Sequence, residues 1–257
     1  MWYRSGQGPA FSFIGGIMKR IVISMLAAIV LTMGSGFAWA EEEHHAEKGA
    51  AEEGTEVEVG VKVWWNKWKR SGGIENFTSD STYLLGPVAE VKFHNNMFIE
   101  AGYLVSMADY KATVLEGAEL RELKVDRHDL DVAAGYMFTH EIGAFVGYRS
   151  SAMKDVSGIE ETAYGPLVGI RGAVPVNEAL SFYGRFTYLF NRLKNDMLVL
   201  VTHESMNGWI AEAGAKYDFT KHISATLGYQ YETTKAKDQG FTDKFSGVTL
   251  GAMYAFE

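Results

Sequence analysis

The stretch Ala211–Tyr231, AEAGAKYDFTKHISATLGYQY, decides the fold of this 257-residue chain. On each side of its central FTKH, apolar residues alternate with glycine or polar residues, as Ala215 and Tyr217 do around Lys216. A period of two residues is the signature of a β-strand, because successive side chains point to opposite faces. The stretch predicts two antiparallel strands joined by a tight turn, with an apolar face that needs an apolar partner.

The same alternation runs from residue 56 to the end of the chain, including the final TLGAMYAFE. Nine connectors join the alternating segments, and long ones alternate with short ones, five long and four short. The long connectors include residues 69–82, 112–122 and 191–207. This order predicts ten antiparallel strands, with both ends of the series on the side of the short turns. The segments are 56–68, 84–94, 99–107, 129–138, 142–149, 164–174, 182–190, 209–219, 223–232 and 249–257.

The N-terminal part of the chain predicts export. A basic start at residues 18–20 precedes the apolar run Ile21–Leu31, and Ala38-Trp39-Ala40 follows. These are the three parts of a cleaved secretory signal peptide at residues 18–40. We interpret residues 1–17 as an extension from a misassigned start codon, and residues 41–55 as a solvated acidic tail.

Composition narrows the class of the exported protein. The mature chain, residues 41–257, has no cysteine, which excludes disulfides and a lipid anchor on cysteine. It carries 21 basic residues against 32 acidic ones, so nothing in its charge favours nucleic-acid binding. No second long apolar run predicts a spanning helix, whereas alternating strands, 28 glycines and 34 aromatic residues suit a membrane β-barrel.

Residues 56–257 resemble the small bacterial outer-membrane β-barrel proteins. The most specific feature is the final strand, which is similar to the C-terminal β-signal read by the barrel-assembly machinery of that superfamily, although Glu257 follows the last aromatic residue. The residues that match the signal are Thr249, Gly251, Tyr254 and Phe256.

The resemblance implies an all-β, transmembrane, antiparallel up-and-down barrel of ten strands, with eight strands as the alternative. It further implies a monomer in the Gram-negative outer membrane, whose partners are lipid, lipopolysaccharide and the assembly machinery, without a cofactor. An unknown partner of the long surface loops is also possible. The resemblance does not identify a functional subfamily.

Charged residues on the inward faces are the first candidates for function. Seven acids and six bases nearly cancel, and side chains fill much of a ten-strand barrel. We expect them to close the lumen with ion pairs, which favours a structural or surface-display role over a porin-like passive channel, the alternative. The candidate lumen network is Glu58, Lys62, Glu90, Lys92, Glu100, Asp129, Asp131, Arg149, Arg171, Arg185, Glu212, Lys216 and Glu232.

Aromatic residues near the strand ends predict two girdles at the membrane surfaces. We assign an outer girdle and an inner girdle to residues whose rings would lie at the level of the lipid headgroups. The outer girdle includes Trp64, Trp65, Trp68, Tyr110, Tyr188 and Trp209, and the inner one includes Tyr217 and Phe219.

Three short motifs suggest chemistry, and we favour an inert interpretation of each. His128-Asp129-Leu130-Asp131 resembles half of the water-activating site of ten-strand outer-membrane proteases, but no second Asp-x-His occurs, and Arg149 is the expected partner of both aspartates. His203-Glu204-Ser205 has the residue types of a lipid-modifying serine hydrolase, but adjacent residues on a strand point in opposite directions. His44-His45 lies in the acidic tail, where no preformed metal geometry is expected. We predict neither an enzyme nor a metal site.

Overall fold

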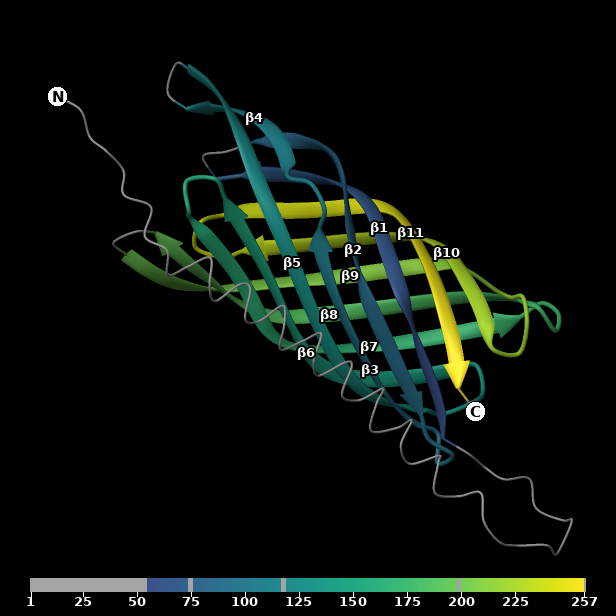
Figure 1. Ribbon diagram of the computed structural model, residues 1–257. Coiled ribbons are helices and arrows are strands. Elements are labelled where there is room, and N and C mark those ends of the chain that lie inside the picture. Colours follow the sequence, from purple (N-terminus) through teal and green to yellow (C-terminus); the bar gives the residue numbers. More distant parts are fainter. Residues whose placement is uncertain (1–54, 74–75, 117–118, 198–199, 257) are drawn as a thin grey trace, which may run out of the picture. The chain divides into compact units, whose positions relative to one another are not determined.

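The computed structural model describes residues 55–73, 76–116, 119–197 and 200–256, and these residues form β-strands joined by turns (Figure 1). The predicted extension, signal peptide and acidic tail lie outside the described residues, except for Thr55. The strands are β1 (Glu56–Gly72), β2 (Phe77–Lys92), β3 (Met97–Ser106), β4 (Tyr110–Glu116), β5 (Glu119–Met137), β6 (Ile142–Asp155), β7 (Glu160–Pro175), β8 (Leu180–Met197), β9 (Leu200–Asp218), β10 (Ile223–Ala236) and β11 (Phe241–Phe256).

The strands close into an antiparallel barrel with ten positions. β1 pairs with both β2 and β11, and the pairing of β3 with β5 completes the ring. β3 pairs with His128–Tyr136 of β5, and β4 pairs with Glu119–Val125 of the same strand, so β3 and β4 together occupy one position. The predicted up-and-down barrel of ten strands is therefore confirmed, and the alternative of eight strands is wrong.

The four short turns share one pattern of backbone hydrogen bonds. In each, the backbone N–H of the first turn residue donates to the carbonyl four residues ahead, as from Phe138 to Ile142. In all four an Asn or Thr oxygen accepts backbone N–H groups at the end of the turn, two in three of the turns, as for Thr139, and one in the turn of Asn95. Asn and Thr form such turns with their own backbone, which explains why HNN, THE, VNEA and FTKH interrupt the strands.

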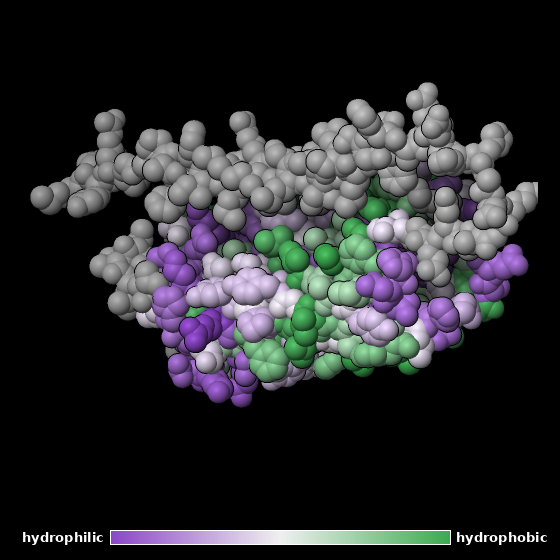
Figure 2. All heavy atoms as spheres, turned by 90° about the horizontal axis from the view of Figure 1, so that it is seen from below, coloured by the Kyte–Doolittle hydropathy of each residue, from purple (hydrophilic) through white to green (hydrophobic). Residues whose placement is uncertain are grey.

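The outward face of the barrel carries an apolar belt, defined by large apolar side chains that are about half exposed. Figure 2 shows hydrophobic residues gathered over the middle of the visible face and hydrophilic residues toward its left end. None of the described residues forms a helix of the length and apolarity needed to cross a bilayer. The belt includes Val61, Trp65, Met97, Ile99, Val132, Val146, Val168, Ile170, Phe186, Leu227, Val248 and Leu250.

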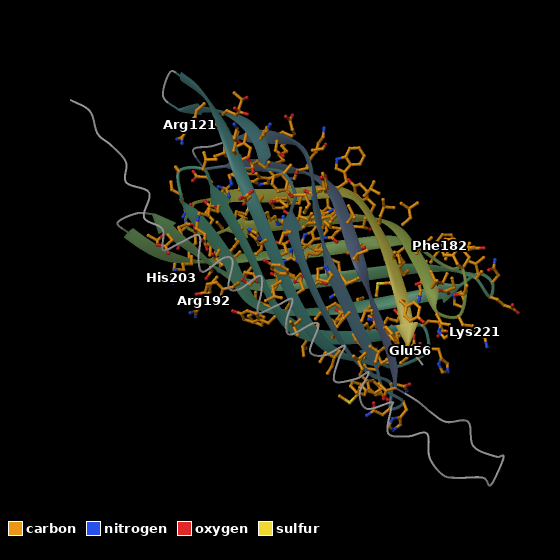
Figure 3. All side chains as sticks on the ribbon, viewed as in Figure 1. Glu56, Arg121, Phe182, Arg192, His203 and Lys221 are labelled. Carbon is orange, nitrogen blue, oxygen red and sulfur yellow. The ribbon has the colours of Figure 1, made fainter. Side chains whose placement is uncertain are left out.

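The strands extend well beyond the belt at the end opposite the short turns. β5 and β9 each have 19 residues and β8 has 18, whereas about 9–11 residues cross a bilayer. Figure 3 labels Glu56, Phe182 and Lys221 at the short-turn end, and Arg121, Arg192 and His203 at the long-strand end.

The extension corrects three of the predicted long connectors. Most of residues 69–82, 112–122 and 191–207 is paired β-strand. Alternation continues there with polar residues outside and buried residues inside, which is the pattern of a strand in water.

Candidate functional site in the barrel lumen

All thirteen residues of the candidate lumen network form ion pairs with N···O distances of 3.2 Å or less. The nine strands that contribute them do so from their inward faces, because residues two apart point to the same side. Together with one set of pairs outside this network, they form four levels along the lumen.

The central level is an ion cluster of Arg127, Asp129, Asp131, Arg149 and Glu232. Arg127 is 0% exposed, and its Nε donates to Asp129 at 2.9 Å while its Nη2 donates to both oxygens of Glu232 at 2.9 Å. Arg149 donates to Asp131 at 2.9 Å, to Glu232 at 2.9 Å and to Asp129 at 3.1 Å. β5 and β10 lie five positions apart in the ring of ten, so Arg127 and Glu232 join opposite walls.

Aromatic rings enclose the buried guanidinium of Arg127. Its Cζ lies 3.8 Å from the centroid of Phe245 and 5.3 Å from that of Trp64. The cation is thereby stabilised by ring faces as well as by carboxylates. Our sequence analysis missed Arg127 because it lies just before the predicted segment 129–138. Its position two residues before Asp129 already places it on the inward face.

The next level joins β2 and β3 to β7 and β8 across the barrel. Arg171 contacts Glu90 at 2.5 Å and Glu100 at 3.2 Å, and Arg185 contacts Glu100 at 2.5 Å. The guanidinium of Arg171 also lies 3.9 Å from the centroid of Phe98. Two cations thus share one carboxylate in the middle of the lumen.

The short-turn end has a third group of pairs between β1, β2 and β9. Glu58 lies 3.1 Å from both Lys92 and Lys216, and Lys62 lies 2.8 Å from Glu212. β1 and β9 are three positions apart, so the Glu58–Lys216 and Lys62–Glu212 pairs also cross the interior, whereas Glu58–Lys92 joins the adjacent strands β1 and β2.

The fourth level lies in the long-strand end and involves residues that our sequence analysis did not select. Arg70 pairs with Asp243 at 2.8 Å and with Glu161 at 2.6 Å. β1 and β7 are opposite one another in the ring, so the Arg70–Glu161 pair also joins opposite walls. Trp68 donates from Nε1 to Asp243 at 2.8 Å.

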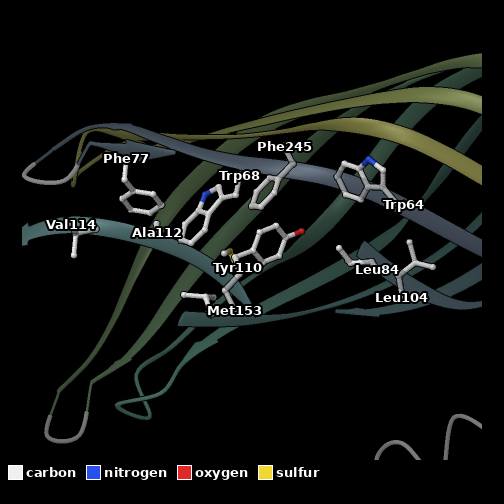
Figure 4. Packing of buried hydrophobic residues seen from close by; sticks show 11 residues of the cluster. Trp64, Trp68, Phe77, Leu84, Leu104, Tyr110, Ala112, Val114, Met153 and Phe245 are labelled. Atoms are coloured by element: carbon white, nitrogen blue, oxygen red, sulfur yellow. The ribbon is translucent and has the colours of Figure 1, made fainter. Parts of the chain in front are cut away.

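The prediction that Trp64, Trp68 and Tyr110 belong to the outer girdle is wrong. Trp64 is 0% exposed and Trp68 is 2% exposed, and both pack inside with Tyr110 and Phe245 (Figure 4). Trp65 is 61% exposed on the outer face. Two consecutive strand residues cannot both face lipid, so the outward side chain of Trp65 requires Trp64 to face inward. Trp68 lies four residues after Trp64 and therefore faces the same side. The other girdle candidates, Tyr188, Trp209, Tyr217 and Phe219, lie on the outward face.

The residues of the β-signal form the closing strand. β11 pairs with β1 along its whole length, from Gly72 opposite Phe241 to Val57 opposite Phe256. Tyr254 and Phe256 face outward, with ring centroids 4.7 Å apart, while Thr249 is buried and donates to Glu212 at 3.1 Å.

The histidine and aspartate of the first hydrolase motif lie on opposite faces of β5. Asp129 is buried in the lumen, whereas His128 is half-buried on the outer face, where its Nδ1 lies 3.5 Å from the hydroxyl of Tyr103. Arg149 contacts both Asp129 and Asp131. Within the described ranges, no group of three histidine or acidic side chains could hold a metal ion, and His44-His45 lies outside these ranges.

The second hydrolase motif forms a loop contact. Glu204 points inward, while His203 and Ser205 are exposed on the outer face. The Oε2 atom of Glu204 accepts the backbone N–H groups of Asp238 and Gln239, at 2.9 Å and 3.1 Å. The carboxylate therefore holds the β10–β11 connection.

We expect Glu204→Ala to loosen this connection, because two backbone donors lose their acceptor. Amide exchange at Asp238 and Gln239, measured on the refolded barrel, should accelerate by about tenfold, equivalent to a loss of about 1.4 kcal/mol. Ser205→Ala is the matched control, since its side chain is exposed, and it should leave exchange at both amides unchanged. Unchanged exchange in Glu204→Ala would contradict the assigned contact.

The comparisons with known proteins agree with this architecture. The model of the outer membrane protein beta-barrel domain family matches residues 122–256, just over half of the chain. The comparison with curated proteins found no match.

The comparison with solved structures gives matches at low identity. The outer membrane protease OmpT from Escherichia coli is 10% identical, with a TM-score of 0.56, and the match covers 79% of this chain and 96% of that one. Ail of Yersinia pestis is 15% identical, with a TM-score of 0.35 and coverage of 78% and 99%. Neisserial surface protein A is 11% identical, with a TM-score of 0.39 and coverage of 78% and 97%. At such identities the likeness concerns the fold alone.

Proposed function

Because the chain belongs to the outer membrane protein beta-barrel domain family, we propose that it is a non-enzymatic surface scaffold with a closed lumen. In this proposal the signal peptide at residues 18–40 directs export, and the short turns face the periplasm. The hairpins at the long-strand end then extend from the cell surface, where they stabilise the envelope or contact a partner.

The ion pairs that join opposite walls carry the proposal. Arg127 reaches Glu232, and Arg70 reaches Glu161, between strands five positions apart. A guanidinium held at both walls occupies the space that a passing solute needs. Three aromatic rings, of Trp64, Trp68 and Phe245, fill the region between these two levels.

A hydrolase is less well supported by the described residues. A water-activating pair needs its histidine and aspartate on one face, and His128 and Asp129 are on opposite faces. Asp129 also has its oxygens occupied by Arg127, Arg149 and Ser151, which leaves little capacity to bind a reacting water.

The refolded wild-type chain is expected to give no stepwise current in a planar bilayer, because at least two levels of ion pairs cross its lumen. A general porin in the same bilayers is the positive control, and a heat-modifiable gel shift verifies that the barrel is folded. Stable single-channel steps from the folded wild type would contradict the closed lumen and favour the passive channel.

Orientation is tested separately on intact cells. Protease added outside should cut only in the hairpins at the long-strand end, since paired strands and turns below the belt are protected. Fragments cut at the four short turns would reverse the proposed orientation. A mature chain recovered as a soluble periplasmic protein would overturn the scaffold itself.

A further inference from the structure

Four lysines form an outward patch on three neighbouring strands, beyond the apolar belt. Lys67 and Lys69 lie on β1, Lys244 on β11 and Lys235 on β10, and all four are exposed. These three strands are consecutive in the barrel. The four residues are called the lysine patch.

The residues that face the lysine patch across the ladders are uncharged, apart from the Lys69–Lys244 pair itself. Across the ladders, Lys67 lies opposite Ser246 and Ser81, and Lys69 lies opposite Thr78. Lys244 is in register with Thr233, while Lys235 is in register with Thr242 and Asn207. Among the described residues no ion pair involves these four lysines, and Asp80, in the β-bulge of β2 beside Lys67 and Lys69, pairs with neither.

Two of the lysines directly oppose each other. Lys69 and Lys244 are Cα partners in the β1–β11 ladder. Like charges at directly opposite positions destabilise a sheet. An anion bound between the two ammonium groups would remove this repulsion.

Three outward lysines elsewhere on the barrel have acidic neighbours. Lys194 lies 3.0 Å from Asp196, and Lys124 lies 3.6 Å from Glu122. Lys154 is in register with Glu160 on β7. The four lysines of the lysine patch have no ion pair of this kind within the described barrel.

The position of the lysine patch along the barrel, relative to the apolar belt, indicates the class of ligand. Lys67 and Lys69 follow Trp65 of the belt by two and four residues, and Lys244 is four residues from Val248. At about 3.4 Å per residue, Lys67, Lys69 and Lys244 lie roughly 7–14 Å along the strand beyond these two belt residues. This is the layer of phosphorylated lipid headgroups, and the flanking serine and threonine hydroxyls can hydrogen-bond sugar.

We propose that the lysine patch binds the phosphate groups of a phosphorylated glycolipid of the outer leaflet, namely lipopolysaccharide. The inference rests on the proposed orientation, in which the long-strand end faces the cell surface. Bound phosphate bridges Lys69 and Lys244, and Lys67 and Lys235 flank it on either side.

The test compares two variants of the refolded full chain in detergent micelles. K67S/K69S/K235S/K244S removes the patch, and K111S/K124S/K154S/K194S removes the same number of outward positive charges from β4, β5, β6 and β8. Binding of purified lipopolysaccharide is measured directly as a Kd. The probe is also used after enzymatic removal of its phosphates, and phosphatidylglycerol is the third probe.

Loss of the patch is expected to weaken lipopolysaccharide binding by about tenfold, while the control variant changes it by less than about twofold. Dephosphorylated lipopolysaccharide should bind wild type as weakly as intact lipopolysaccharide binds the patch variant. Added lipopolysaccharide should also raise the urea midpoint of wild type more than that of the patch variant, because it binds the folded state.

Three results would overturn the inference: equal losses in both variants, undiminished binding after dephosphorylation, or equally tight binding of phosphatidylglycerol. The heat-modifiable gel shift verifies that each variant is folded. Single-channel conductance of the wild type in planar bilayers would contradict the closed lumen but would leave the proposed binding to the lysine patch unchanged. Short turns exposed on cells would instead remove the orientation on which the patch depends.

Discussion

Replacing Arg127 with methionine is expected to lower the free energy of unfolding of the refolded barrel by about 3–5 kcal/mol. Methionine has a similar length and no charge, so the change leaves Asp129, Asp131 and Glu232 facing a single cation, Arg149. The two buried carboxylates, Asp129 and Glu232, and the partly exposed Asp131 are costly with one guanidinium, because the buried charges have lost water without gaining an equal partner. Urea unfolding in lipid vesicles, followed by tryptophan fluorescence, measures the change.

Two further variants separate the ion cluster from a general effect of losing an arginine. Arg192→Met removes an exposed arginine of β8 and should change the free energy of unfolding by no more than about 0.5 kcal/mol. R127M/E232Q restores the former balance of charge and should recover part of the loss. Equal urea midpoints for wild type and Arg127→Met would show that the cross-lumen contact contributes nothing.

The barrel could be predicted from the sequence because alternation reports the two faces of a strand directly. In residues 211–231, a shift of one residue would put Lys216 in lipid and Tyr217 in the lumen, so only one register is compatible with both environments. The same parity placed Glu58, Glu90 and Arg171 on the inward face before any pairing was known.

The sequence does not predict which charged residues pair across the lumen. The alternation of side chains assigns each residue to one face of the sheet, but it does not give the height of the residue along the barrel axis. Arg127 and Glu232 are 105 residues apart, and their contact depends on the tilt and stagger of the closed barrel. The predicted strand segments were also limited to about the length that crosses a bilayer. That limit excluded Arg127, Arg70 and Asp243, although each continues the alternation of its strand.

The tryptophans of β1 show where composition misleads. A girdle is expected to be rich in tryptophan, and that expectation overrode the parity of Trp64 and Trp68. Trp68 can be buried inside the barrel because Asp243 accepts its indole N–H, and in the same way Asn66 accepts the hydroxyl of Tyr110 at 2.7 Å. Aromatic residues within a barrel strand can therefore be assigned to lipid or lumen only after the register is set.

A comparison of Trp68→Ala with Trp65→Ala tests whether Trp68 faces the lumen and Trp65 faces lipid. Trp68→Ala should lower the free energy of unfolding by about 3–5 kcal/mol, because it leaves a cavity among Phe77, Tyr110 and Phe245 and takes a donor from Asp243. Trp65→Ala, three residues away, should cost about 1 kcal/mol or less, since that ring is mostly exposed to lipid. Urea unfolding in the same vesicles measures both. Equal losses, or a larger loss for Trp65, would place Trp68 at the lipid surface and remove the aromatic part of the closed lumen.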